Sequence, residues 1–231
     1  MTSEDAAAAL LIALPVAFNV FFFALARMFS YPDILRSPTA TVLERFDAGG
    51  VRLQLVWYGF MLTAVVFAPL AVLLGVVLAP SAGAVVPVAT TIGVLASVVQ
   101  FLGLARWPFL VPALARVYAD EATSDARREA TAVVFEAFHR YLGVAVGEGL
   151  GYLFTGVWTI LIGAAMIEST VFSWWLGVPG LAVGAALVFG SFEFVGRPGE
   201  HGWKPAGVIV PVAYTAWSLW LVAAGIVLLV D

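Results

Sequence analysis

The chain has 231 residues, of which 62% are hydrophobic and 11% charged, and its formal net charge is −4. A typical soluble domain has about 45–50% apolar and about 25% charged residues. The charges are also unevenly distributed, because charge-free runs cover 6–26, 53–105, 149–167, 169–192 and 205–230. This composition excludes an ordinary soluble domain and predicts an integral membrane protein whose first partner is the lipid bilayer.

The residue counts exclude several classes of catalytic and metal-binding site. The chain has no cysteine, which excludes disulfides, thiolate metal sites, iron–sulfur clusters and cysteine nucleophiles. The only histidines are His139 and His201, and the single lysine is Lys204. The zinc-protease, serine-hydrolase and Walker motifs are all missing from the sequence. We therefore expect no metal, no cofactor and no nucleic-acid partner.

Six membrane spans are predicted. About 20 apolar residues cross a bilayer core of about 30 Å, so the run 53–105 suffices for two spans, and the turn signal at 80–83 (PSAG) divides it. The predicted fold is an all-α transmembrane bundle forming one domain over 1–231. Its spans are expected near 6–28, 53–79, 85–105, 145–167, 171–194 and 206–230.

The basic residues predict the orientation. All 11 arginines and lysines lie in or beside the connections 29–52, 106–144 and 195–205. Connections rich in Lys and Arg stay in the cytoplasm. These three connections are therefore expected to be cytoplasmic, and both termini extracytoplasmic.

Two cytoplasmic connections carry helix signals of their own. The pair at 37–38 (SP) predicts a helix start, and the glycine pair at 49–50 predicts its end. In the third connection, Ser124 is expected to cap a helix that begins at Asp125. This helix is expected to lie along the membrane interface and to turn into the fourth span at Gly143.

Glu148 is the leading candidate for a functional residue, because a carboxylate inside a span is costly and usually faces protein or a water-filled cavity. Tyr141, Glu148, Tyr152, Thr155 and Thr159 lie 7, 4, 3 and 4 residues apart, which predicts one polar stripe on an α-helix. Two interpretations stay open. Glu148 is either a ligand or proton site, or a structural group that hydrogen-bonds a neighbouring helix.

Other polar residues are expected at a similar depth. Asn19, Gln100 and Tyr214 each lie about 9–15 Å inside the cytoplasmic face at the helical rise of about 1.5 Å per residue. Together with Arg106 they predict a polar pocket around Glu148, with Glu148 hydrogen-bonded to one of them. The alternative is that each residue forms an isolated bond between helices. Glu193 is expected to pair with Arg197, which follows it by four residues.

Glycines recur every four residues at Gly143, Gly147 and Gly151. Small residues at this spacing let two membrane helices approach closely. We therefore expect the fourth span to pack tightly against a neighbour along this face.

Glu136 and His139 have the E-x-x-H spacing of di-iron helical bundles. That site needs a second such pair and further glutamates, which the chain lacks, so Glu136 is interpreted as an ion-pair partner of Arg140. On a continuous α-helix His139 points about 180° away from Glu148.

Several stretches resemble a bacterial six-helix membrane family described only as a domain of unknown function. They are 106–112 (RWPFLVP), 138–148 (FHRYLGVAVGE), 151–158 (GYLFTGVW), 32–35 (PDIL) and the glycine pair at 49–50. The resemblance implies six helices in the bacterial cytoplasmic membrane and brings no assigned activity. Relatives often have histidine where this chain has Gly149, so a Glu–His catalytic pair is not expected here.

Three functions are compatible with these patterns. The favoured one is an accessory or regulatory membrane protein that binds a partner membrane protein or a lipid-like small molecule. The second is a small proton-linked transporter that uses Glu148. The third is a membrane enzyme acting on a lipid or quinone, for which only Glu148 and Tyr152 are available. The glycine-rich helix faces and the few ionisable groups favour a non-enzymatic role.

Overall fold

The computed structural model describes residues 2–195 and 203–230. The main helices are α1 (Ser3–Phe29), α2 (Thr39–Ala82), α3 (Val85–Phe109), α6 (Gly151–Glu168), α7 (Trp174–Gly190) and α8 (Lys204–Val230). The shorter elements are the 3₁₀ turn η1 (Asp33–Arg36), α4 (Val111–Ala119), α5 (Asp125–Phe138) and the π-helix η2 (His139–Leu150). The predicted all-α fold is confirmed: within the described residues, five helical stretches are long and apolar enough to span a membrane, and α7 is a shorter apolar helix.

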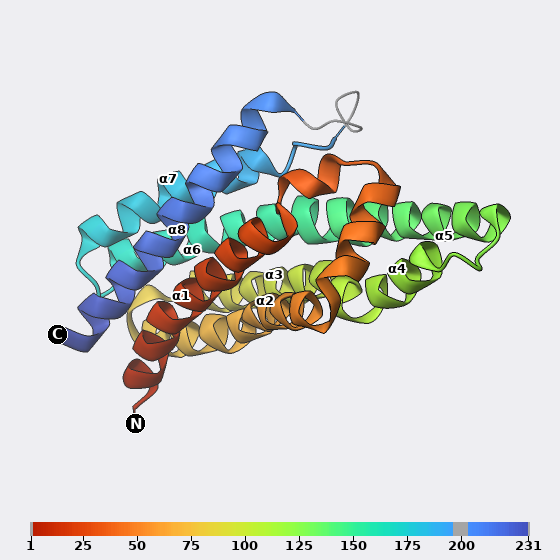
Figure 1. Cartoon of the computed structure of the whole chain (residues 1–231). Helices are drawn as coiled ribbons and strands as arrows, with labels where there is room; N and C mark the ends of the chain where they lie inside the picture. Colours follow the sequence, from red (N-terminus) through yellow and green to blue (C-terminus); the bar gives the residue numbers. More distant parts are fainter. Residues whose placement is uncertain (1, 196–202, 231) are drawn as a thin grey trace.

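The six main helices form a closed ring. Each helix packs against the next in chain order, α3 is followed in the ring by α6, and α8 returns to contact α1. Both termini lie at one end of this bundle (Figure 1). The helices α4 and α5 extend beyond the opposite end. The six main helices run alternately between the two ends, so the chain returns to the end where it began.

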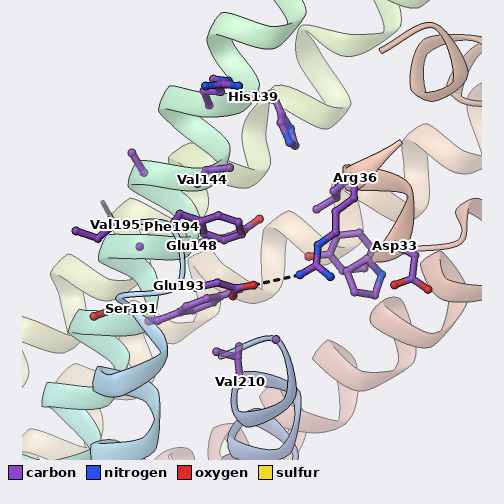
Figure 2. Close-up of a pocket in the computed structure, with 18 of the residues that line it drawn as sticks. Asp33, Arg36, His139, Val144, Glu148, Ser191, Glu193, Phe194, Val195 and Val210 are labelled. Atoms are coloured by element: carbon purple, nitrogen blue, oxygen red, sulfur yellow. Dashed lines mark hydrogen bonds and ion pairs between the residues drawn. The ribbon is translucent and has the colours of Figure 1, made fainter. Parts of the chain in front are cut away.

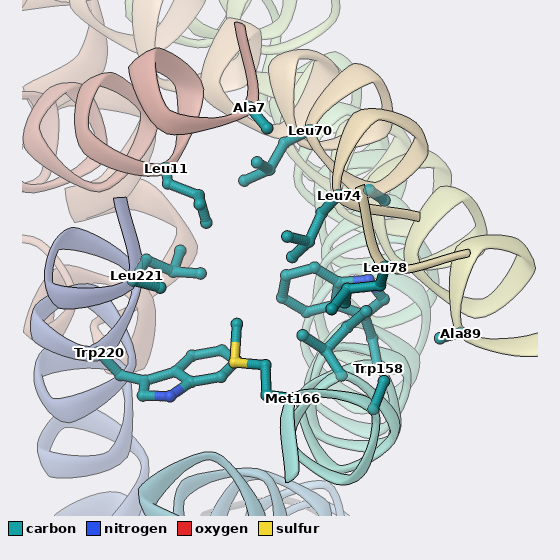
Figure 3. Close-up of a cluster of buried hydrophobic side chains, with 14 of the residues drawn as sticks. Ala7, Leu11, Leu70, Leu74, Leu78, Ala89, Trp158, Met166, Trp220 and Leu221 are labelled. Carbon is teal, nitrogen blue, oxygen red and sulfur yellow. The ribbon is translucent and has the colours of Figure 1, made fainter. Parts of the chain in front are cut away.

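The ring is filled with apolar side chains in the half nearest the termini. Figure 3 shows this cluster, in which the main helices direct side chains toward a common centre. Its members include Leu11, Leu70, Leu74, Trp158, Met166, Trp217, Trp220 and Leu221. A second apolar cluster lies at the other end, where Trp57 and Trp107 stack with their ring centroids 4.4 Å apart. This second cluster fixes the first connection against α2 and α3.

Two of the glycines singled out in the sequence interrupt the regular helices. Gly50 has φ of 56° and ψ of −155°, which kinks α2 between its cytoplasmic part and its span. Gly83 has φ of 58° and forms the turn between α2 and α3. Positive φ values are adopted readily by glycine because it has no Cβ atom.

The prediction that the chain turns at Gly143 is wrong. The segments α5, η2 and α6 form one continuous helical stretch, Asp125–Glu168, with 44 residues. Its two α-helical parts, of 14 and 18 residues, are together about 48 Å long at about 1.5 Å per residue, which already exceeds the thickness of a bilayer core of about 30 Å. The helix expected in the third connection therefore begins after Ser124 as predicted but continues directly into the fourth span. Gly143 lies within the helix against the buried side chain of Arg106, so it allows close packing.

Candidate functional site

A cavity of about 1200 Å³ opens at the end of the bundle opposite the termini. It lies between four segments of the chain, which are 31–42 after α1, 135–153 along η2, 191–195 after α7 and 207–211 in α8. Figure 2 shows His139, Val144 and Glu148 along one wall, with Arg36 and Asp33 opposite. All four segments belong to, or adjoin, the connections that carry the basic residues.

The π-helix brings His139 and Glu148 onto the same wall. Nine residues separate them, which is two and a half turns of an α-helix and would place them on opposite faces. A π-helix has i→i+5 hydrogen bonds and more residues per turn, so nine residues make about two turns. Both side chains therefore line the cavity. The prediction that His139 points away from Glu148 is wrong because it assumed α-helical geometry throughout.

Glu148 lies partly buried in this wall. Within the described part of the chain, its carboxylate forms neither an ion pair nor a hydrogen bond. Tyr31 and Tyr152 also line the cavity. A carboxylate in such a position is available to a ligand.

The residues expected around Glu148 have other partners. Asn19 donates to Ser218 Oγ at 2.9 Å and to the Pro15 carbonyl at 2.7 Å. Gln100 donates to Thr155 Oγ1 at 2.8 Å. These are bonds between helices, α1 to α8 and α3 to α6, and they satisfy the polar groups away from the cavity.

Tyr214 packs against Tyr152 with a ring-centroid distance of 5.6 Å. Tyr152 follows Glu148 by four residues and faces the cavity, while Thr155 and Thr159 are fully buried further along α6. Tyr141 is 68% exposed and is absent from the cavity wall. The predicted stripe therefore begins at Glu148, because the π-helix changes the direction of the earlier side chains.

Arg106 lies behind the wall. Its guanidinium is buried, donates to the Gly103 carbonyl, and has one nitrogen 3.4 Å from His139 Nδ1. It also lies over the Trp107 ring, at 5.1 Å from the ring centre. Its Nε has no hydrogen-bond partner, and the described residues offer it no carboxylate within ion-pair distance. Arg106 therefore contributes positive charge from behind η2 without contacting Glu148.

The three glycines of the predicted packing face all lie against α3. A Cβ atom on Gly147 would lie 3.0 Å from the Cα atom of Gly103, and one on Gly151 would lie 3.1 Å from Gln100 Cγ. Gly143 lies against the Arg106 guanidinium. This contact holds the wall that carries Glu148 against the third span.

One ion pair crosses the mouth of the cavity. Arg36 Nη2 donates to Glu193 Oε1 at 3.1 Å, which joins the first connection to the segment after α7 (Figure 2). Glu193 is buried, and this burial raises the pKa of its carboxyl group while Arg36 opposes the rise. The expected partner Arg197 lies outside the described residues. The pair was not predicted from the sequence, because its members are 157 positions apart.

Glu136 accepts a hydrogen bond of 2.9 Å from the Thr39 hydroxyl, which ties α5 to the start of α2. The expected ion pair between Glu136 and Arg140 is absent from the described structure, and Arg140 lines the cavity instead. No cluster of potential metal ligands occurs among residues 2–195 and 203–230.

Residues 6–225 match the family model described as a domain of unknown function, DUF4386. The chain belongs to this family. The match extends over all six main helices and over every segment of the cavity wall. No functionally curated protein and no solved structure is detectably similar to the chain. Membership of DUF4386 carries no assigned activity, so the function has to be argued from the cavity.

Proposed function

We propose that this DUF4386 protein is an accessory membrane protein that holds a lipid-like small molecule in the cavity beside Glu148. The observation that carries this proposal is the cavity of about 1200 Å³ itself. Pockets for drug-sized ligands have about 300–1,000 Å³, so the volume suffices for a ligand with an alkyl chain. A packed bundle with a purely structural role has no need for such a space.

The cavity wall is amphipathic, which matches a lipid-like ligand. Its charged side chains are Asp33, Arg36, Glu136, Arg140, Glu148 and Glu193. Leu150 and Phe192 also line it, and they are 39% and 55% exposed. Large apolar side chains that are both exposed and part of the wall connect the cavity with the lipid-facing surface of the bundle. This arrangement supports entry of the ligand from the bilayer.

The proposed orientation places the cavity at the cytoplasmic leaflet, with both termini outside. The charge asymmetry supports it, because the described connections that carry basic residues lie at the end opposite the termini (Figure 1). Anionic lipids give the cytoplasmic leaflet a negative surface potential that attracts Lys and Arg. Arg36 and Arg140 therefore lie at the level where the polar part of a lipid-like ligand would enter.

Gly207 offers the sharpest test of ligand binding. A Cβ atom at this position would lie 3.6 Å from Arg36 Nη2 and 3.8 Å from Glu193 Oε1, which is ordinary contact distance on the cavity wall. We expect Gly207→Trp to obstruct the cavity beside the Arg36–Glu193 pair and Gly207→Ala to leave it open. Native mass spectrometry of the purified protein should detect bound amphiphile in the wild type and in Gly207→Ala, and little in Gly207→Trp. Equal amounts in all three proteins would contradict the proposal.

A proton-linked transporter is the second candidate, and the unpaired carboxylate of Glu148 favours it. The polar chain beyond Glu148 continues through Thr155 to Thr159, which accepts a 3.0 Å bond from Trp217 Nε1. An indole N–H only donates, so it cannot pass a proton onward. The apolar cluster around Trp158 fills the rest of the ring. This structure therefore offers no continuous proton path among the described residues, and ligand holding is the better-supported function.

A further inference from the structure

Some charged groups on the cavity wall have a partner within the described part of the protein, and others have none. Arg36 and Glu193 pair with each other, and Glu136 accepts a hydrogen bond from Thr39. Asp33 and Arg140 are exposed at the mouth. Among the described residues, Glu148 is thus the carboxylate that faces the cavity from the depth of a span. Arg106 is only 6% exposed and lies behind the wall, so a ligand in the cavity does not contact it.

We propose that the cavity selects ligands that carry an ammonium group on an apolar chain, and that the ammonium binds between the Glu148 carboxylate and the rings of Tyr31 and Tyr152. This inference rests on the proposed function and names the class of ligand. It follows from the placement of one open carboxylate and two aromatic side chains around the same cavity, with Glu148 and Tyr152 on one wall and Tyr31 on the segment that faces it.

The chemistry of Glu148 favours a cation. A partly buried carboxylate gains most from an opposite charge, and it repels an anion at the same position. Aromatic faces add to the attraction, because a cation within about 6 Å of a ring centre interacts favourably with the π-system. A neutral hydroxyl could form a hydrogen bond to Glu148 but would gain neither effect.

The two tyrosine rings are held in place before any ligand arrives. The Tyr31 ring packs edge-on against Trp57 at 5.2 Å and Phe60 at 6.0 Å. The Tyr152 ring packs against Tyr214 at 5.6 Å. Fixed rings lower the entropic cost of binding, because their rotamers need no ordering when the ligand enters.

The apolar part of the wall runs along the same helix. Leu150 and Leu153 follow Glu148 in sequence and line the cavity. A ligand with its ammonium at Glu148 would lay its alkyl chain along these residues toward the lipid-facing opening. Two sources share this chemistry, namely the headgroup of an amine-containing phospholipid and a single-chain alkylammonium compound.

The test uses the full chain in nanodiscs of phosphatidylglycerol, a lipid without an ammonium group. The probes are decyltrimethylammonium, decyl glucoside and decyl sulfate, which share one chain length and differ in charge. We expect the wild type to bind the ammonium probe at least about tenfold more tightly than the neutral probe and to bind the sulfate most weakly, because only the ammonium is attracted by both the carboxylate and the aromatic rings. Glu148→Gln should lose the ammonium preference and keep binding of the neutral probe. Glu148→Asp keeps the charge and should retain the preference for the ammonium probe. It provides a second variant for the test if Glu148→Gln does not fold.

The outcomes separate this inference from the proposed function. If the wild type binds all three probes equally and Gly207→Trp binds none, the cavity holds amphiphiles and ammonium selection is wrong. If the wild type binds no probe, the inference and the proposed function both fail. If Glu148→Gln keeps the ammonium preference, the assignment to Glu148 is overturned. Where the preference holds, displacement of the probe by added phosphatidylcholine identifies a lipid headgroup as the source, and no displacement identifies a single-chain compound.

Discussion

The polar side chains inside this bundle form two groups. Asn19 and Gln100 are satisfied by neighbouring helices, while Glu148 and Tyr152 face a cavity. All four could be assigned to a span from the sequence, because helical rise relates residue number to depth. The direction of each side chain could not be predicted, since it depends on which helices are neighbours in the ring.

Gly147 is expected to be intolerant of a side chain. A Cβ atom there would lie 3.0 Å from the backbone of α3, which cannot move as a side chain can. We predict that Gly147→Leu destabilises the protein by about 1–3 kcal/mol or more, because overpacking forces backbone shifts. Thermal unfolding in detergent measures the change. Ala145→Leu is the matched control on an exposed position of the same helix, and an unchanged melting temperature in Gly147→Leu would show that this face meets lipid.

The pair of Arg36 and Glu193 predicts a dependence on pH. Burial raises the pKa of Glu193 above its ordinary value of 4.5, so the folded state binds the proton more tightly than the unfolded chain. Its contribution to stability is thus fully present below 4.5 and is lost as pH rises through the raised pKa. Arg36→Gln removes the positive charge that opposes the rise of the Glu193 pKa. The pH range over which stability is lost should therefore extend further toward high pH.

We therefore expect Arg36→Gln to lower stability by about 1 kcal/mol near neutral pH, since the arginine is largely exposed and its attraction is screened by water. The difference in melting temperature from the wild type should shrink as the pH falls below 4, where Glu193 is mostly protonated in both the folded and the unfolded state. A difference that stays constant or grows on acidification would contradict the assigned role of this pair.

At the scale of elements, the sequence indicated the number of helices and the breaks at Gly50 and Gly83, because long apolar runs and glycines carry those signals. It did not indicate the π-helix η2 or the continuity from α5 to α6. The glycines of this stretch pack closely against α3, which is a tertiary contact that the sequence pattern does not contain. The error about His139 follows from this one difference in helical pitch.

Cysteine labelling can test the geometry of η2, because the chain has no cysteine of its own. Single cysteines at His139, Val144 and Gly149 are predicted to react with a water-soluble maleimide, since these positions line the cavity at spacings of five. Cysteines at Leu142 and Val146 should stay unreactive. If the cysteine at position 139 does not react, and reactive positions along this segment recur every three or four residues, the segment is an ordinary α-helix.

For the whole molecule, the closed ring explains why the ends of the bundle differ. Aromatic and aliphatic side chains fill the half near the termini, and the ring opens into the cavity where the connections carry arginines. The order of helices in the ring could not be predicted from the sequence, although the number of main helices could. In the proposed orientation, this difference between the two ends places the cavity at the cytoplasmic leaflet.

The orientation predicts the behaviour of reporter fusions. Alkaline phosphatase fused after Asp231 should be active, because it folds only outside the cytoplasm, and a cytoplasmic reporter at the same point should be silent. Fusions within the connection that follows α4, near Glu121, should show the opposite pattern. An active cytoplasmic reporter after Asp231 would place the cavity at the outer leaflet.

The central claim is that the cavity beside Glu148 holds a lipid-like molecule, and a cryo-electron microscopy structure in lipid nanodiscs tests it most directly. We predict elongated density that begins between Glu148 and the ring of Tyr152 and continues along Leu153 toward the membrane. The same density should be missing from Gly207→Trp, whose side chain occupies the space. A wild-type map in which the cavity contains only water, or is closed by its own side chains, would contradict the claim.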